Sequence, residues 1–235
     1  MPKTHENSII TKSGRMKYIS WQNSDVLEHG KIIGMISFGI DITEQKQRMA
    51  LVERIRLTSF VKDISISLAE GTTLHKILDQ CANAVVDYLD AAFARIWTLN
   101  EKENILELQA SAGVYTHIDG SHSRIPVGKF KIGRIAQERK PYLTNSIFDD
   151  EYISDKDWAK REGMVSFAGY PLIVEEHLVG VIAMFACKPL TEFTTRALAS
   201  VSDIIALGID RKQSEEALRL SEGKYRMLIE NLPQR

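Results

Sequence analysis

Residues 165–187, VSFAGYPLIVEEHLVGVIAMFAC, decide the fold of this chain. Two apolar runs, 165–174 and 178–187, stand on either side of the polar residues Glu175-Glu176-His177. Apolar runs of this length that are bounded by a polar turn are typical of buried strands. Gly180 stands where the second run leaves the turn, a place where a strand tolerates glycine. The stretch therefore predicts two strands joined by a tight turn, the clearest strand pair in the chain.

Two helices and a second strand pair are expected upstream of this stretch. The strands cover 92–99 and 105–111 and form an antiparallel hairpin. Gly71 ends one helix, and Thr72 or Thr73 caps the next. The first helix has apolar residues at spacings of four, three and four, which lie on one helical face: Leu57, Val61, Ile64 and Leu68.

Short elements fill the rest of the central region. We expect short strands at 124–127 and 142–144, short helices at 132–139 and 154–158, and a helix capped by Thr191 or Thr194 that runs toward the C-terminus. This order predicts an α+β fold, in which an antiparallel sheet has helices on one face and loops or short helices over the other.

Four motifs narrow the fold to a family. They are IGRIA at 132–136, KPY at 140–142, EGMVSFAGYPL at 162–172 and LVGVIAMF at 178–185. In this order they resemble the recurring motifs of a GAF domain, which would occupy residues 57–210. The resemblance implies a sensory domain with a small-molecule pocket between the sheet and its roof of loops.

The N-terminal region has a pattern of its own. Residues 30–46, GKIIGMISFGIDITEQK, contain a turn, an Ile/Met/Phe run and a charged helix start that Asp41 or Thr43 can cap. The apolar run predicts a buried strand. Together with GRMKYISWQN at 14–23, it resembles the last two strands of a PAS domain, the part called PAC. Residues 1–45 are therefore identified as the C-terminal part of a PAS domain.

The two segments that flank the central domain are expected to be helical. Residues 46–56 are dense in charge and lack Gly and Pro, as expected of a linker helix. Residues 214–233, SEEALRLSEGKYRMLIENLP, resemble the opening helix of another PAS domain. Residues 211–235 would thus form a signalling helix and the start of that domain. The whole order is similar to the sensory regions of multi-domain PAS/GAF sensor histidine kinases, with cyclic-di-GMP enzymes as the alternative.

Composition excludes several classes of partner. Thirty Lys and Arg stand against 31 Asp and Glu, so no net field attracts nucleic acid or an anionic membrane. The longest apolar run, 178–187, has half of the roughly 20 residues that a membrane helix needs. The two cysteines are far apart and belong to no metal-binding motif, which suits a reducing cytoplasm. A cytoplasmic segment without nucleic-acid or membrane contacts is expected.

Catalytic signatures are missing from the sequence. None of the six histidines heads a phosphoacceptor box, and no glycine-rich ATP-binding box, cyclase signature or phosphate-binding loop is present. This segment is therefore expected to be no enzyme, and to act on a covalently linked output domain. Some GAF domains reduce free methionine sulfoxide with several pocket cysteines. The alternative to a non-catalytic role is therefore that this segment is such a reductase. Only Cys81 and Cys187 are available, and Cys81 is expected to pack in the core.

Two loops are candidates for ligand sites. His117, Asp119 and His122 offer metal or haem ligands, but their spacing is nonspecific and a polar loop is expected. We expect no metal, haem or bilin. Residues 145–151 faintly resemble the cyclic-nucleotide motif of some GAF domains, but Ser146 replaces its lysine, so a capped acidic loop is expected.

The candidate pocket residues come from one strand and from the expected roof. Alternation along residues 93–97 places Phe93, Arg95 and Trp97 on one face, with Ala94 and Ile96 on the other. Arg95 would counter an anionic ligand, unless it is a surface or salt-bridged arginine. The roof aromatics are expected to be ligand contacts or core residues: Phe148 and Trp158. The sequence does not indicate which ligand binds.

The last helix carries a coiled-coil pattern that predicts a homodimer. Fours and threes alternate along eight positions, the heptad period, although three of the positions are polar or small. We call these positions the C-terminal seam: Leu207, Arg211, Ser214, Leu218, Ser221, Tyr225, Leu228 and Leu232. The alternative is that 214–232 is only the amphipathic start of the next domain.

Overall fold

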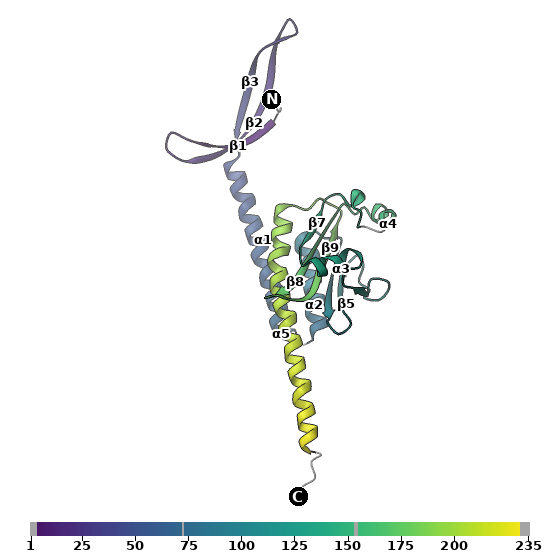
Figure 1. Ribbon diagram of the computed structural model, residues 1–235. Helices are drawn as coiled ribbons and strands as arrows, with labels where there is room; N and C mark the ends of the chain where they lie inside the picture. The colour runs from purple at the N-terminus through teal and green to yellow at the C-terminus, as the bar shows by residue number, and fades with distance from the viewer. Residues whose placement is uncertain (1–3, 72, 153–154, 231–235) are drawn as a thin grey trace. The chain divides into compact units, whose positions relative to one another are not determined.

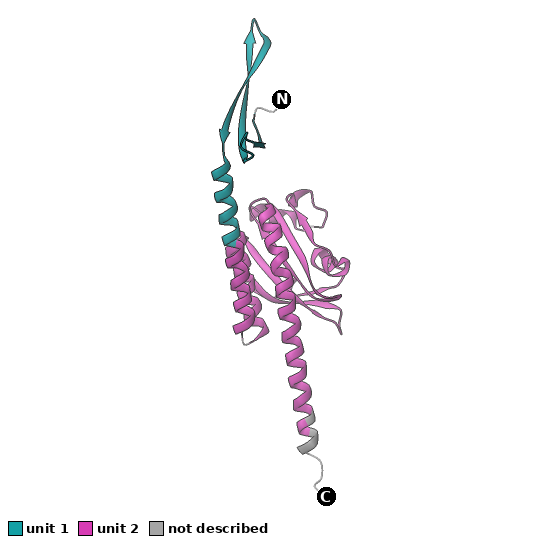
Figure 2. Ribbon diagram, turned by 90° about the vertical axis from the view of Figure 1, so that its left-hand side faces the viewer, with its two compact units in different colours: residues 1–56 teal, residues 57–235 magenta. Residues whose placement is uncertain are grey.

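The computed structural model describes residues 4–71, 73–152 and 155–230. The chain divides into two compact units, residues 1–56 and 57–235 (Figure 2). Helix α1 (Thr43–Glu70) begins in the first unit and ends in the second, so the expected helices at 46–56 and from residue 57 onward are one continuous helix. No helix in the described part of the chain has the length and apolarity that a bilayer crossing requires.

The first unit is built on a three-stranded antiparallel sheet. Its strands are β1 (Thr4–Ile10), β2 (Met16–Glu28) and β3 (Lys31–Asp41), in that order. The expected hairpin is formed by β2 and β3. Strand β1 was not predicted, because its sequence is mixed and largely polar. Asp41 accepts the backbone N–H of Thr43 at 3.0 Å and caps the start of α1, in agreement with one of the two sequence alternatives.

The prediction that β3 is a buried strand is wrong. All of its residues are exposed, Ile32 by 65% and Phe38 by 62%. Among the described residues of this unit no second layer packs on the sheet, so both faces of β3 meet solvent. An apolar run therefore identified the strand correctly but not its burial.

The second unit contains a six-stranded antiparallel sheet. Its order is β6-β5-β4-β9-β8-β7, and the deciding stretch forms β8 and β9. The turn between them is shorter than expected and places Glu175 at a φ of 55°. The strands are β4 (Phe93–Asn100), β5 (Ile105–Gly113), β6 (Arg124–Pro126), β7 (Tyr142–Thr144), β8 (Ser166–Val174) and β9 (His177–Ala186).

The two faces of this sheet carry different layers (Figure 1). Helices α2 (Leu74–Leu89) and α5 (Glu192–Glu230) pack on one face, and the second half of α1 packs against them through Phe60, Ile64 and Leu68. Short elements cover the other face: α3 (Phe130–Glu138), the 3-10 helix η1 (Ile147–Asp149) and α4 (Lys156–Arg161). The predicted α+β architecture is confirmed.

Side chains near the helix starts satisfy the orphan N–H groups. Thr73 accepts the N–H of Lys76 at 3.3 Å at the start of α2, and Thr191 accepts that of Thr194 at 3.1 Å at the start of α5. The sequence offered Thr72 or Thr73 as the cap of α2 and Thr191 or Thr194 as the cap of α5. Thr72 lies outside the described residues. Cys81 is fully buried in the helix-side core, as expected.

Two glycines permit close backbone packing. A Cβ at Gly180 in β9 would lie 2.1 Å from the carbonyl oxygen of Trp97 on the neighbouring strand. A Cβ at Gly208 in α5 would lie 2.2 Å from Cδ2 of Leu68, where α1 and α5 meet. The first contact is with backbone and has no side chain that can move away.

Replacing Gly180 by Ala is expected to destabilise the second unit. The new methyl group forces strands β4 and β9 apart, and overpacking of this kind costs roughly 1–3 kcal/mol in the free energy of unfolding. The measurement is urea unfolding of the full chain followed by tryptophan fluorescence. Gly223→Ala is the matched control, because a Cβ on Gly223 in α5 would have no neighbouring atom within 4 Å, and helix propensity favours Ala there. Equal midpoints for the two variants would contradict the prediction.

Candidate functional site

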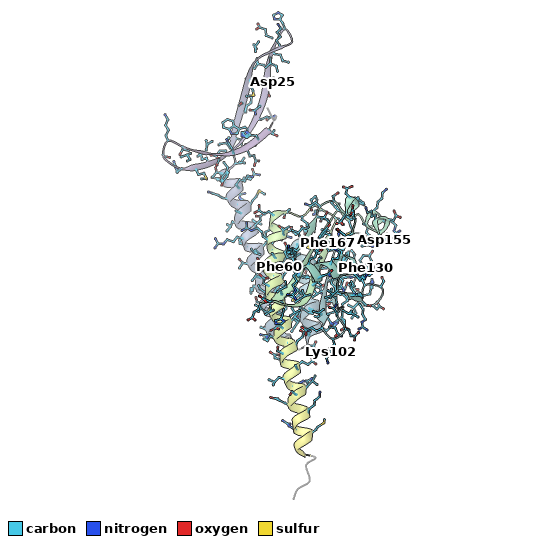
Figure 3. All side chains as sticks on the ribbon, viewed as in Figure 1. Asp25, Phe60, Lys102, Phe130, Asp155 and Phe167 are labelled. Atoms are coloured by element: carbon cyan, nitrogen blue, oxygen red, sulfur yellow. The ribbon has the colours of Figure 1, made fainter. Side chains whose placement is uncertain are left out.

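A cavity of about 290 Å³ lies on the face of the sheet opposite the long helices. Figure 3 labels Phe130, Asp155 and Phe167 on this side and Phe60 on the helix side. The cavity stands at the lower end of the roughly 300–1,000 Å³ range of ligand pockets. Strands β4, β8 and β9 supply its floor: Phe93, Arg95, Trp97, Phe167, Ala183 and Phe185. Loops and short elements supply the rest: Tyr115, His117, His122, Ile125, Phe130, Lys131, Ile132, Tyr152, Asp155 and Trp158.

Alternation along β4 sorts its side chains between the two faces. Phe93, Arg95 and Trp97 line the cavity, whereas Ala94 and Ile96 belong to the core under the helices. The register to β5 shifts after Ile96, but the register to β9 is continuous from Phe93 to Thr98. The expected period of two therefore holds, and the structure brings three sequence-predicted site residues together. Their role as ligand contacts stays a prediction.

Arg95 is the unusual member of this wall. Its side chain is only 9% exposed, and its Nε donates to Oγ of Ser111 at 3.1 Å. Among the described residues no carboxylate lies within ion-pair distance of the guanidinium and its Nη atoms have no hydrogen-bond partner, although every fully buried polar side-chain atom is satisfied. Arg95 itself lines the cavity. Burial lowers the pKa of Arg95, but an arginine stays charged.

Aromatic rings enclose the space beside Arg95. Phe93 stacks on Phe185 with ring centroids 5.0 Å apart. The ring of Trp158 stands edge-on to both, at 5.9 and 5.3 Å. Nε1 of Trp158 donates to the hydroxyl of Tyr115 at 2.9 Å, which ties α4 to the loop after β5. Trp158 is thus a roof aromatic, as the sequence suggested.

The histidine loop also reaches the cavity. His117 and His122 both line it, and the carbonyl of His122 accepts Nε1 of Trp97 at 2.9 Å. Burial, and then the charge of Arg95, lower the pKa of His122, so its imidazole is neutral at pH 7. In the part of the chain that the structure describes, three potential metal ligands do not come together anywhere. The expected absence of metal and haem stays a prediction.

A buried ion pair closes one side of the cavity. Nζ of Lys131 lies 2.5 Å from Oδ2 of Asp150, with side chains 8% and 1% exposed. The same oxygen accepts the hydroxyl of Tyr142 at 3.1 Å, and Oδ1 accepts the N–H of Tyr152 at 2.8 Å. Nζ also stands 4.5 Å from the ring centroid of Tyr142 and 4.6 Å from that of Phe167.

The ionisation of this pair follows from its contacts. Burial would raise the pKa of Asp150, but the hydrogen bonds from Lys131 and Tyr152 outweigh burial and the pKa is lowered. Burial lowers the pKa of Lys131, against the attraction of Asp150. Asp150 is therefore ionised near pH 7, and its carboxylate favours the charged form of Lys131. Residues 145–151 were expected to form a capped acidic loop, and there Asp149 accepts a bond from Ser146 and Asp150 accepts the N–H of Tyr152. The burial of Asp150 against Lys131 was not foreseen.

Phe148 does not take its expected place in the roof. It is 45% exposed and is not among the residues that line the cavity. Phe130 stands at the rim instead, 62% exposed and at a φ of 52°, a conformation that bulky residues rarely adopt. Tyr115, Phe130 and Lys131 were missed because they lie in or beside the irregular segment 112–131, which has no periodicity to sort its side chains.

The C-terminal seam is only partly visible on α5. Leu207 and Leu218 are 59% and 62% exposed, and Ser214 and Ser221 are also exposed. Arg211 turns toward α1, where its Nη2 donates to the carbonyl of Leu68 at 2.5 Å. Tyr225 and Leu228 lie on α5 but their side chains are outside the described part, and Leu232 is outside the described residues.

Asp150→Asn is expected to cost about 3–5 kcal/mol of unfolding free energy, because it leaves the Lys131 charge buried without its partner. The measurement is urea unfolding at pH 7, with the exposed Asp149→Asn as control. The Asp150 pKa is lowered in the folded state, so its contribution is complete above about pH 4 and is lost as pH falls through the folded pKa. The gap between wild type and Asp150→Asn should therefore close in acid. Equal losses in the two variants at pH 7 would refute the assignment.

Several solved structures have a similar fold. The GAF domain of the Acinetobacter phosphoenolpyruvate-protein phosphotransferase matches at 18% identity and a TM-score of 0.58, over 68% of this chain and 97% of that one. Residues 122–287 of a methyl-accepting chemotaxis protein match at 18% identity and 0.54, over 66% and 99%. Free methionine-R-sulfoxide reductase from Neisseria meningitidis matches at 14% identity and 0.56, over 68% and 91%. At these identities the likeness shows the fold alone.

The family itself is shown by sequence. No curated protein matches the chain significantly. The family model described as "GAF domain" matches residues 71–210, more than half of the chain. That range contains the whole six-stranded sheet and every residue that lines the cavity. The chain therefore belongs to the GAF domain family.

Proposed function

We propose that this chain is a sensory module whose GAF domain binds a small molecule in the cavity and relays the event through α1 and α5 to a covalently linked output domain. The observation that carries the proposal is Arg95, a buried arginine that lines the cavity and has no carboxylate partner among the described residues. A buried charge without a counterion is costly. An anionic or aromatic ligand that meets Arg95 relieves that cost.

A route from the cavity to α5 runs through the sheet. Strands β8 and β9 supply part of the cavity floor on one face and pack against α5 with the other. The hydroxyl of Tyr170 in β8 donates to the carbonyl of Thr195 in α5 at 3.1 Å. A shift of these strands on ligand binding therefore moves α5.

The proposal extends to the protein around the domain. The three-stranded sheet of the first unit, with its exposed apolar strand β3, supports the assignment of residues 1–45 to the end of a PAS domain. Residues 211–235 would begin a second PAS domain. We propose a cytoplasmic sensor histidine kinase as the parent protein, with the sensory region of a cyclic-di-GMP enzyme as the alternative.

A non-catalytic role fits the cysteines. Neither Cys81 nor Cys187 lines the cavity. Burial raises the pKa of Cys81 to about 12, which keeps it a thiol at neutral pH. Cys187 is exposed at the end of β9. Thiol-dependent reduction of free methionine sulfoxide that is lost in Cys187→Ser would overturn this part of the proposal.

A thermal-shift screen of a metabolite library is expected to give hits with the wild-type chain that disappear in Arg95→Ala. The variant loses the cation that compensates the ligand charge. Arg196→Ala is the matched control, because Arg196 is exposed on α5, where its Nη1 lies 3.3 Å from Oε1 of Glu192, and is not among the described residues that line the cavity. Hits that persist unchanged in Arg95→Ala would show that ligands bind elsewhere.

Dimerisation through the C-terminal seam is expected at micromolar concentration. Analytical ultracentrifugation should find a dimer that Leu207→Glu and Leu218→Glu dissociate, because each change places a charge in an apolar seam. Leu220→Glu is the control, since Leu220 is 57% exposed but lies off the seam. A strict monomer, or a dimer equally sensitive to all three changes, would rule out this seam.

A further inference from the structure

We propose that the ligand is an aromatic monocarboxylate, with its carboxylate on the Nη atoms of Arg95 and its ring against Phe93, Phe185 and Trp158. The inference rests on the proposed sensory function and adds the chemical class of the ligand. Three independent features carry it: the net charge of the wall, the orientation of the guanidinium and the aromatic enclosure.

The net charge of the buried wall points to a single negative charge on the ligand. In the described part of the chain Arg95 has no carboxylate partner, whereas Nζ of Lys131 lies 2.5 Å from Oδ2 of Asp150. His122 is neutral at pH 7, and the exposed Asp155 caps α4 through its bond from the Trp158 N–H at 2.7 Å. One cation is therefore left to compensate. A phosphate monoester or a dicarboxylate would bury a second negative charge without a partner.

The orientation of Arg95 favours a planar carboxylate. Ser111 accepts from Nε and donates its own hydroxyl proton to the carbonyl of Tyr115 at 2.7 Å. These bonds fix the guanidinium plane and leave the Nη edge for the ligand. Two parallel N–H groups on that edge match the two oxygens of one carboxylate, which gives geometric selectivity as well as attraction.

The aromatic enclosure favours a ring on the same ligand. Phe93 and Phe185 stack on each other in the cavity wall, and the ring of Trp158 makes a T-shaped contact with both. Offset and edge-to-face contacts between rings strengthen binding beyond the area they bury. A cavity of about 290 Å³ suits a ligand of one or two rings.

Isothermal titration of the full chain with defined acids tests the class. Benzoate, phenylacetate and indole-3-carboxylate are the probes, and at least one is expected to bind. Benzamide lacks the charge, phthalate adds a second charge, and cyclohexanecarboxylate lacks the π faces. Each is expected to bind more weakly than its matched probe, the first two by at least tenfold. Arg95→Lys keeps the cation but loses the two-pronged edge, and is expected to lose at least tenfold.

The outcomes separate this inference from the sensory function. Benzamide or phthalate binding as tightly as benzoate would overturn the monocarboxylate class but leave a ligand site. Failure of all the acids, with a different hit in the library screen that depends on Arg95, would likewise overturn the class alone. Failure of both experiments would overturn both. The wild-type comparison of acid with amide decides the charge question even where Arg95→Lys does not fold.

Discussion

The pairing of β4 with β9 at the centre of the sheet is the constraint on which the rest of the domain depends. Both strands are buried on both faces, so alternation must divide their side chains between two different environments. Ala94, Ile96, Ile182 and Met184 pack under the helices, and the positions between them face the cavity. Gly180 lets the two backbones approach. The same register that builds the helix-side core therefore builds the floor of the cavity.

The two buried cations near the cavity, Lys131 and Arg95, differ in their partners. Lys131 is satisfied by Asp150 and two aromatic faces, and joins α3 to the segment after η1. Arg95 has only Ser111 and the ring of Phe93, 5.4 Å away, in the described part of the structure. The first cation holds the roof together. The second lies in the cavity wall, where we propose that it meets a ligand.

Local patterns were enough for the architecture, and they placed Phe93, Arg95, Trp97 and Trp158 in the wall of the cavity. Alternation placed Phe93, Arg95 and Trp97 on one face because a strand has a period of two, whatever its neighbours are. The burial of β3 was wrong because burial depends on a second layer, which an apolar run does not specify. The Lys131–Asp150 pair joins residues 19 positions apart, with α3, β7 and η1 along the chain between them. In the sequence, nothing distinguishes Lys131 and Asp150 from exposed charged residues, because only the folded roof brings them together.

The proposed relay from the cavity depends on how α5 is built. Its first half is anchored in the helix-side core by fully buried residues such as Leu198, Val201 and Ile205, whereas residues 213–224 are exposed. At 1.5 Å per residue, its 39 residues span roughly 58 Å, so a small rotation at the anchored half becomes a larger displacement at the far end. Gly208 and the Arg211 bond to the Leu68 carbonyl fix α5 against the end of α1. That junction combines the Leu68 side chain packed on Gly208 with one polar bond. In the proposed relay, a shift of α5 along α1 would exchange few contacts, which is the condition for two arrangements of similar energy.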